Sequence, residues 1–129
     1  MKAELTSYNQ APRKVRLVTD MVKGKKVPEA LAALSFLPKR ASLPITKLIQ
    51  SAAANAVQQG EKVEDLRIEN ITVDSAGMLV RLMPRAMGRG APIRHRKSRV
   101  KVTLVSSAEQ KAAPAKKVAK KAVKKAATA

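Results

Sequence analysis

LVRLMPRAMGRGAPIRHRKSRVK, residues 79–101, is the stretch that decides how this chain folds. Strand-like runs stand at both of its ends and prolines and glycines cluster between them, which is the pattern of a long two-stranded β-hairpin. We therefore predict a hairpin arm over about residues 78–101, with its tip at residues 87–92. The predicted tip residues are Met87, Gly88, Arg89, Gly90, Ala91 and Pro92.

The arm is strongly cationic, and no carboxylate occurs between Asp74 and Glu109. Its eight basic residues are Arg81, Arg85, Arg89, Arg94, Arg96, Lys97, Arg99 and Lys101. If all of them met phosphates, log K would fall with log salt at a slope of roughly 6 to 7. One base contact adds only roughly 1 to 3 kcal/mol. The arm also lacks Phe, Tyr and Trp for stacking on bases. We therefore expect recognition through shape and the phosphate backbone.

The residues before the arm predict a helical layer. Alternating polarity indicates a half-buried strand over residues 2–8. Apolar residues spaced by three and four, bounded by proline and glycine, indicate helices over residues 12–24, 28–38 and 39–60. Pro44 lies inside the third of these, where a proline costs roughly 3 kcal/mol. Either that helix bends at Pro44 or its regular part begins nearer residue 42.

Two further strands are predicted, one immediately before the arm in the sequence and one immediately after it. In the first, Leu66 and Ile68 share one face, but the apolar phase then shifts to Ile71 and Val73, which indicates a bulge near Asn70. A turn or a second irregularity precedes the arm, and the strand after the arm alternates without a break. The predicted fold class is α+β: a small three-stranded antiparallel sheet packed with three helices, plus the long protruding β-hairpin arm.

The net charge of +18 is unevenly distributed. Residues 1–74 carry 12 basic and 8 acidic side chains, a net of +4, whereas residues 75–108 carry +8 and residues 109–129 carry +6. A nearly balanced body with two cationic appendages indicates a polyanionic partner, above all nucleic acid. We divide the chain into a body with its arm, residues 1–108, and an Ala/Lys-rich tail over residues 109–129. The tail cannot bury a core and is expected to be disordered.

Basic residues of the body add candidate ligands for nucleic acid. Arg13, Lys14 and Arg16 stand in the first turns of the first predicted helix, where the helix dipole disfavours cations. An anion outside the helix would offset that cost, although a merely solvated basic face explains these residues as well. Lys39 and Arg40 stand at the start of the third predicted helix.

The sequence offers little chemistry for catalysis. His95 is the only histidine and lies among the cations of the arm, away from any Asp or Glu. The GRG at residues 88–90 lacks the strand-to-helix context of a phosphate-binding loop. The chain has no cysteine, which excludes disulfides and thiolate metal sites. We therefore predict that the protein is no enzyme and holds no metal or cofactor.

The sequence also bears on location. The N-terminus lacks the apolar region of a signal peptide, and no run of about 18 apolar residues occurs. We expect a protein that is neither exported nor bound to membranes, and no transit peptide is evident.

Five motifs in order carry a resemblance to a known family. They are APRKVRLV (11–18), GKKV followed by EAL (24–31), SAAANA (51–56), DLRIENITVD (65–74) and MPRAMGRG (83–90). Over about residues 1–105 the chain resembles protein twenty-two of the large ribosomal subunit, in its bacterial or organellar form.

This resemblance implies an α+β body on the large-subunit rRNA and an arm that threads through the rRNA to line the nascent-peptide exit tunnel. It implies a role in subunit assembly, neighbouring ribosomal proteins and the nascent peptide as partners, and a monomer within a cytoplasmic or organellar ribosome. The predicted RNA-binding residues are Arg13, Lys14, Arg16, Lys39, Arg40, Arg81, Arg85, Arg89, Arg94, Arg96, Lys97 and Arg99.

A nucleoid architectural protein is the alternative. Such a protein would bend DNA with a proline-tipped arm, for which Pro92 and Ile93 are suitable residues, and a basic tail would also serve it. The motifs of the body favour the ribosomal family instead, and nothing in the sequence marks a dimer interface.

Overall fold

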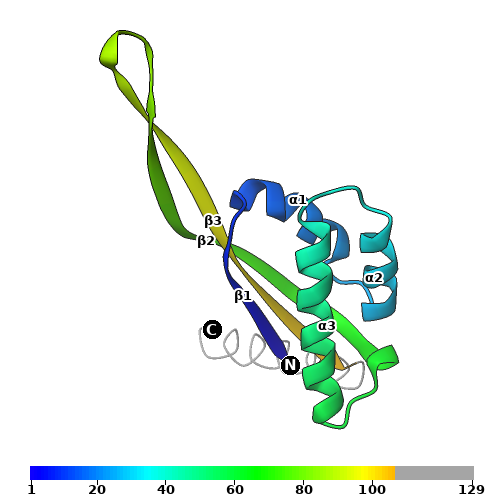
Figure 1. Cartoon of the computed structure of the whole chain (residues 1–129). Helices are drawn as coiled ribbons and strands as arrows, with labels where there is room; N and C mark the ends of the chain where they lie inside the picture. The colour runs from blue at the N-terminus through cyan, green and yellow to red at the C-terminus, as the bar shows by residue number, and fades with distance from the viewer. Residues whose placement is uncertain (107–129) are drawn as a thin grey trace, which may run out of the picture.

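Three antiparallel strands form the sheet, in the spatial order β1–β3–β2 (Figure 1). They are β1 (Lys2–Tyr8), β2 (Leu66–Pro84) and β3 (Gly90–Ser106). β3 is central because it pairs with β1 on one side and with β2 on the other. The predicted three-stranded antiparallel sheet is therefore confirmed. The computed structural model describes residues 1–106, so the predicted tail at residues 109–129 lies outside the described residues.

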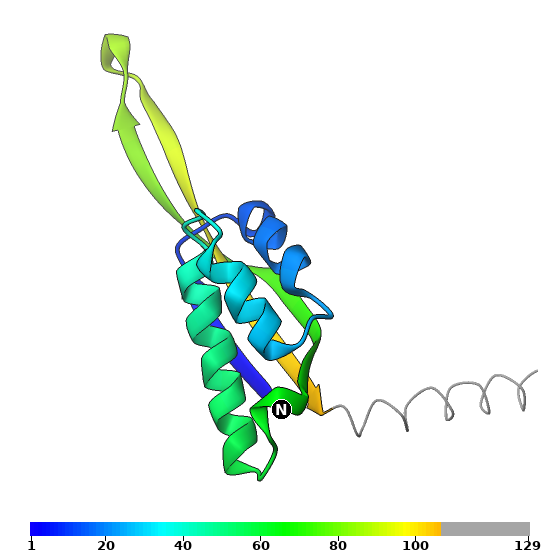
Figure 2. The ribbon, with the colours of Figure 1, turned by 90° about the vertical axis from the view of Figure 1, so that its right-hand side faces the viewer.

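Three helices cover one face of this sheet, as predicted (Figure 2). They are α1 (Pro12–Val22), α2 (Val27–Ser35) and α3 (Ser42–Gln58). Two short 3-10 turns, η1 (Val63–Asp65) and η2 (Ala86–Gly88), complete the described elements. Pro12 and Pro28 lie in the first turns of α1 and α2, where the N–H that proline lacks has no partner in the helix.

Pro44 does not bend its helix. Because α3 begins at Ser42, Pro44 falls in the first turn, where backbone N–H groups have no intrahelical acceptor. The second of the two alternatives for this segment is therefore the one the protein adopts. The hydroxyl of Ser42 donates to the carbonyl of Leu34 and so joins the start of α3 to α2.

The core lies between the helices and the inner face of the sheet. Twenty apolar residues are buried there, and none of them is aromatic. Ala52, Ala53 and Ala56 of α3 are buried, and their small side chains let this helix, which packs on α2, β1 and β3, approach its neighbours closely. Asn55 of the same helix is exposed, and its Nδ2 donates to the carbonyl of Lys2 at 3.4 Å, which joins α3 to β1.

Two bulges shape β2 before it leaves the body. The register against β3 shifts between Ile68 and Asn70, where the sequence predicts a bulge, and shifts again between Ser75 and Met78. Gly77 stands in the second shift with a φ of +66°, a conformation strained for residues with a side chain. Bulges of this kind bend a strand, and the arm begins at this one (Figure 1).

Beyond the second bulge, β2 and β3 continue alone as the arm. Seven cross-strand pairs run from Met78 with Arg96 to Pro84 with Gly90. At about 3.3 Å per residue, such a ribbon is roughly 20 Å long.

The turn of the arm lies at residues 85–89. It is closed by a hydrogen bond of 2.7 Å from the N–H of Arg85 to the carbonyl of Arg89. Met87 and Gly88 both have a positive φ, of 59° and 69°, and complete the reversal there. Gly90, Ala91 and Pro92, which the sequence assigns to the tip, are instead the first paired residues of β3.

Candidate nucleic-acid interface

Two basic hollows meet at the root of the arm, where β3 passes the start of α1. Their volumes are about 550 and 560 Å³. No carboxylate lines either hollow, and six cations do. We call these six the basic collar: Arg13, Lys14, Arg16, Arg40, Arg94 and Arg96. The structure thus brings together half of the twelve predicted RNA-binding residues.

Arg94 and Arg96 line both hollows, whereas His95 between them lines only the second, and the alternation of β3 explains what the two arginines share. Ser98 and Val100 of this strand are buried and face the helices. The extra residues at the register shifts lie on β1 and β2, so β3 keeps its alternation into the arm. Since every second residue of a strand shares a face, Arg96 and Arg94 continue the helix-side face out of the body.

The N-terminus of α1 adjoins the collar. Ala11 caps this helix without a side-chain hydrogen bond, and no acidic residue stands in its first turn. Pro12 has no N–H and the N–H of Lys14 donates to the carbonyl of Ala11, so it is the dipole of this helix end that favours an anion, and Arg13 and Lys14 add formal charge beside it. Phosphate groups are suited to this combination.

Arg16 also has a structural role. Its Nε and Nη2 donate to the carbonyl of Val73 at 3.1 and 2.7 Å. These two bonds join α1 to β2 immediately before the bulge from which the arm begins. Arg16, predicted only as an RNA ligand, therefore positions the root of the arm while it lines the first hollow.

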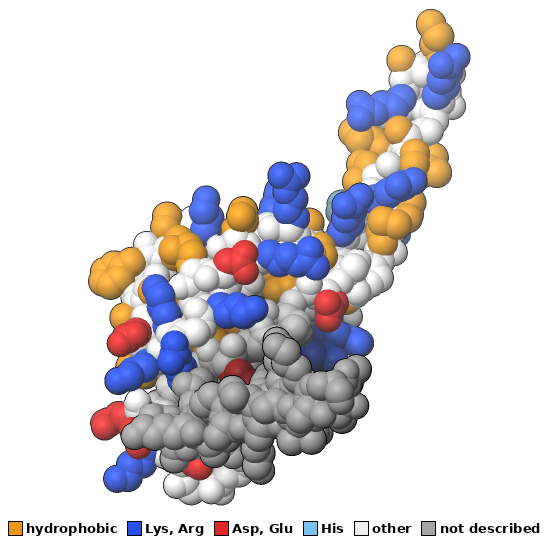
Figure 3. Space-filling model, turned by 180° about the vertical axis from the view of Figure 1, so that it is seen from behind, with side chains coloured by type: hydrophobic (Ala, Val, Ile, Leu, Met, Phe, Trp, Pro, Cys, Tyr) orange, Lys and Arg blue, Asp and Glu red, His pale blue; other side chains and the backbone are white. Residues whose placement is uncertain are grey.

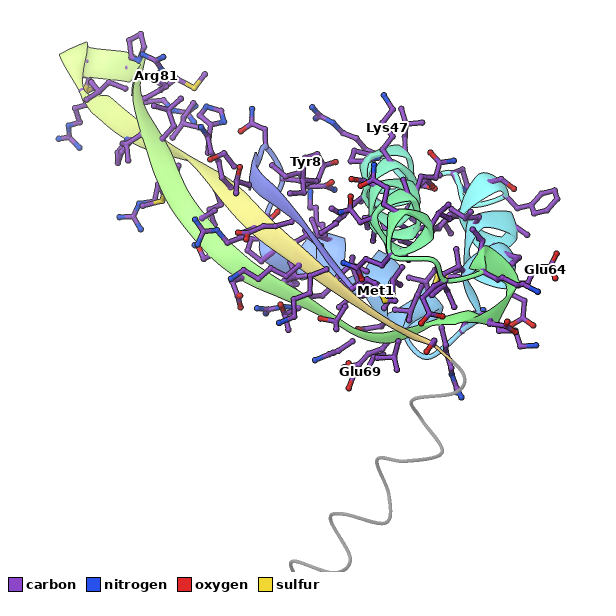
Figure 4. The ribbon with its side chains drawn as sticks, turned by 90° about the horizontal axis from the view of Figure 1, so that it is seen from below. Met1, Tyr8, Lys47, Glu64, Glu69 and Arg81 are labelled. Atoms are coloured by element: carbon purple, nitrogen blue, oxygen red, sulfur yellow. The ribbon has the colours of Figure 1, made fainter. Side chains whose placement is uncertain are left out.

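A polar network holds the loops around the second hollow. The Tyr8 hydroxyl, at the end of β1 nearest the arm (Figure 4), lies 2.8 Å from Gln10 Oε1 and 3.3 Å from the carbonyl oxygen of Arg40. The Ser98 hydroxyl donates to the carbonyl of Gln10 at 3.0 Å. Burial raises the pKa of Tyr8 above its ordinary value of 10.0, although Arg40 acts in the opposite direction. The phenol is therefore a protonated donor at neutral pH.

The other six predicted RNA-binding residues are not members of the collar. Lys39 stands beside Arg40 on the loop between α2 and α3. Arg81 lies well out along the arm (Figure 4), while Arg85 and Arg89 close its turn. Together they extend the line of positive charge from the body to the end of the hairpin.

Lys97 and Arg99 occupy the alternate positions of β3, on the side of the sheet away from the helices. Arg99 Nε forms an ion pair of 3.0 Å with Glu4, which also lies 4.0 Å from Lys101 Nζ. Exposed pairs of this kind contribute roughly 0 to 1 kcal/mol. They nevertheless give Arg99 an acidic neighbour, which no cation of the collar has among the residues lining the hollows.

The arm carries apolar side chains among its cations, and Figure 3 shows the two kinds interspersed along it. The exposed large apolar residues of the arm are Met78, Leu79, Val80, Leu82, Met83, Met87 and Ile93. Exposed apolar side chains in this number on a thin ribbon indicate a segment that a partner covers.

Within residues 1–106, no helix combines the length and the apolar character needed to cross a membrane. In the same part of the chain, His, Asp and Glu side chains nowhere gather in a group of three that could hold a metal ion.

The α+β body, the projecting hairpin and the collar define a class of small, strongly cationic protein built to contact a polyanion over an extended line. Within that class, the chain belongs to the ribosomal protein L22p/L17e family, whose model matches residues 3–105. The match covers nearly all of the body and the whole arm.

Individual relatives agree with the family assignment. The chain is 48% identical over 106 residues to the large ribosomal subunit protein uL22 of Pelobacter propionicus, covering 81% of this chain and 96% of the relative. It is 49% identical over 104 residues to the uL22 of Syntrophotalea carbinolica, covering 80% and 94%. The uL22 of Geobacter sulfurreducens is 45% identical over 103 residues, covering 79% and 93%.

Proposed function

We propose that this protein is a structural component of the large ribosomal subunit that binds rRNA, assists subunit assembly and lines the nascent-peptide exit tunnel with its arm. The observation that carries this proposal is the basic collar at the root of a cationic hairpin. Membership of a ribosomal protein family supports the choice of rRNA as the polyanion. Neighbouring ribosomal proteins and the nascent peptide are the further partners, and the protein acts as a monomer within a cytoplasmic ribosome.

In this proposal the collar sets the direction of the arm. Phosphates of the rRNA bind Arg94 and Arg96 on the arm and Arg13 and Lys14 on the body at the same time. Because these contacts span both parts, they restrain the angle between the arm and the body. The arm then lies between RNA segments, with its arginines on phosphates and its apolar side chains against sugars and bases. At the tip, Met87 contacts the nascent peptide in this proposal, and its 93% exposure supports that assignment.

The collar is tested by its effect on the salt dependence of binding. We expect the double variant Arg94→Gln/Arg96→Gln, made in the full chain, to bind purified large-subunit rRNA more weakly. The slope of log K against log salt should also become shallower by about 1.4 to 1.8, because two phosphate contacts are lost. Filter binding between about 50 and 300 mM salt measures both quantities.

A charge-matched control separates the collar from the net charge. Lys47→Gln/Lys62→Gln removes two exposed cations of the body that line neither basic hollow. If this control changed the slope as much as the collar variant does, the collar would have no special role. Sedimentation of a cell lysate tests the ribosomal assignment itself, since a nucleoid DNA-bending protein would be recovered with chromosomal DNA and be absent from large subunits.

A further inference from the structure

A third hollow, smaller and more apolar, lies beside the collar between α1 and the loop that joins α2 to α3. Its volume is about 230 Å³. Val18 and Ala41 are buried at its base, and Leu17, Met21 and Leu37 line it as well. Its polar lining residues are Gln10, Lys14, Lys39 and Arg40, so three cations and no carboxylate surround it. We call it the apolar hollow.

The apolar hollow is open to water. Leu17 is 68% exposed and Met21 is 48% exposed. The two residues are four positions apart on α1, so they lie on the same side of the helix, one turn from each other. A pair of exposed apolar side chains beside a buried apolar base and a cationic rim is the composition of a ligand site rather than of an ordinary solvated surface.

The apolar hollow is continuous with the proposed RNA interface. Gln10, Lys14 and Arg40 line both the apolar hollow and the second basic hollow. An RNA strand whose phosphates lie on Lys14 and Arg40 therefore passes the mouth of the apolar hollow. The Tyr8 hydroxyl, within 3.3 Å of the Arg40 carbonyl, restrains the backbone on which this shared rim stands.

We propose that the apolar hollow binds one unstacked nucleobase of the rRNA whose phosphates lie on the collar. This inference rests on the proposed function and assigns it a specific subsite. A volume of about 230 Å³ is below the range of pockets for drug-sized ligands, roughly 300 to 1,000 Å³, and suits a single planar ring. The thioether of Met21 packs well on aromatic rings, and Arg40 can stack over a base.

An acidic, apolar segment of a neighbouring protein is the competing occupant, and the observations favour the base. With a volume of about 230 Å³, the hollow has room for one ring but not for the several anchors of an amphipathic helix. Two of its three cations also line the second basic hollow, so phosphates on the collar already neutralise them.

Replacing the apolar walls tests the inference. We expect Met21→Gln in the full chain to weaken binding to purified large-subunit rRNA by roughly 5- to 150-fold, the effect of losing one stacked base. The slope of log K for rRNA binding against log salt should stay unchanged, because no phosphate contact is removed. Leu43→Gln is the matched control, since Leu43 is 66% exposed but lies outside the hollows described above. Both substitutions are at exposed positions, and thermal unfolding verifies that the fold is kept.

A cross-link locates the occupant. The chain has no cysteine, so Leu17→Cys provides a single attachment point for a photoactivatable group. We expect a cross-link to one unpaired nucleotide, read as a single stop of reverse transcription. Unchanged rRNA affinity of Met21→Gln, or a cross-link in assembled subunits to a protein instead of RNA, would overturn the nucleobase site and leave the proposed function standing. If the wild-type chain did not bind rRNA at all, the proposed function and this site would fall together.

Discussion

A cation of the collar is useful only if it is held in position as well as charged. Arg16 is held by its two bonds to Val73, and the backbone at Arg40 is held by the hydroxyl of Tyr8. A free arginine side chain carries about 2 kcal/mol of rotamer entropy, so ordering it before binding lowers the cost of binding. At the scale of single residues, the interface is therefore pre-organised by uncharged groups.

The Tyr8→Phe variant tests this support. It removes the hydrogen bond that the partly buried Tyr8 hydroxyl donates. We expect the free energy of unfolding in urea to fall by about 0.5 to 1.5 kcal/mol at pH 7. Arg40 keeps its charge, so affinity for rRNA should fall by much less than in the Arg94→Gln/Arg96→Gln variant.

The same variant has a predicted pH dependence. Because the pKa of Tyr8 is raised in the folded protein, the stabilisation from its protonated form is complete below pH 10.0 and is lost as the pH rises through the folded-state pKa. The stability difference between wild type and Tyr8→Phe should therefore be constant from about pH 6 to 9 and shrink above pH 10. Tyr8 is the single tyrosine, so ultraviolet absorbance follows its titration directly. A difference that widened above pH 10 would contradict the assignment.

At the scale of elements, the arm and the body are energetically separate. All twenty buried apolar residues lie outside residues 74–99.

Replacing residues 76–97 by Asn-Gly joins Ser75 to its partner Ser98 through a two-residue hairpin turn. We expect this variant to unfold cooperatively, with a melting temperature within about 4 to 8 °C of wild type, which corresponds to about 1 kcal/mol. Its rRNA affinity should fall steeply, with a salt slope shallower by about 4 to 5, because six cations are removed. An unfolded body would show that the arm contributes to the core after all.

Local sequence patterns predict most of the helices and strands correctly. They do not predict features that depend on an unusual backbone conformation or on contacts between residues far apart in the sequence. The helices and the bulge near Asn70 were predictable because apolar periodicity is a local property. The prediction of the tip at residues 87–92 lies too far along the chain, because the clustered glycine and proline residues follow the turn itself. Met87 in the turn adopts the left-handed conformation, which is uncommon for methionine and so is not predictable from its residue type. Two contacts join residues that are far apart in the sequence: the ion pair of Arg99 with Glu4, and the contact of Tyr8 with Arg40. The periodicity of one strand or one helix cannot predict such contacts.

At the scale of the whole molecule, the buried core and the excess positive charge lie in different parts: the core is in the body and much of the charge is on the arm. The body holds the entire described core and little net charge, while the arm holds many cations and exposed apolar side chains on a two-stranded ribbon. A ribbon of this kind is marginally stable in water, and its cations repel one another. RNA would remove both difficulties, because phosphates neutralise the cations and the surrounding RNA covers the apolar side chains.

Hydrogen exchange should make this division visible. In the free full-length protein we expect amides of residues 78–96 to exchange at least about tenfold faster than those of residues 100–104, because opening a solvent-exposed ribbon costs little, whereas Val100, Val102 and Leu104 are fully buried. On binding large-subunit rRNA, protection should rise most along the arm and change little in the buried part of β3, which serves as the internal control. Mass spectrometry of peptides from the two segments measures both rates in one sample. Equal protection of the two segments in the free protein would mean that the arm is stable on its own, and RNA would then dock on a preformed rod instead of ordering the hairpin as it binds.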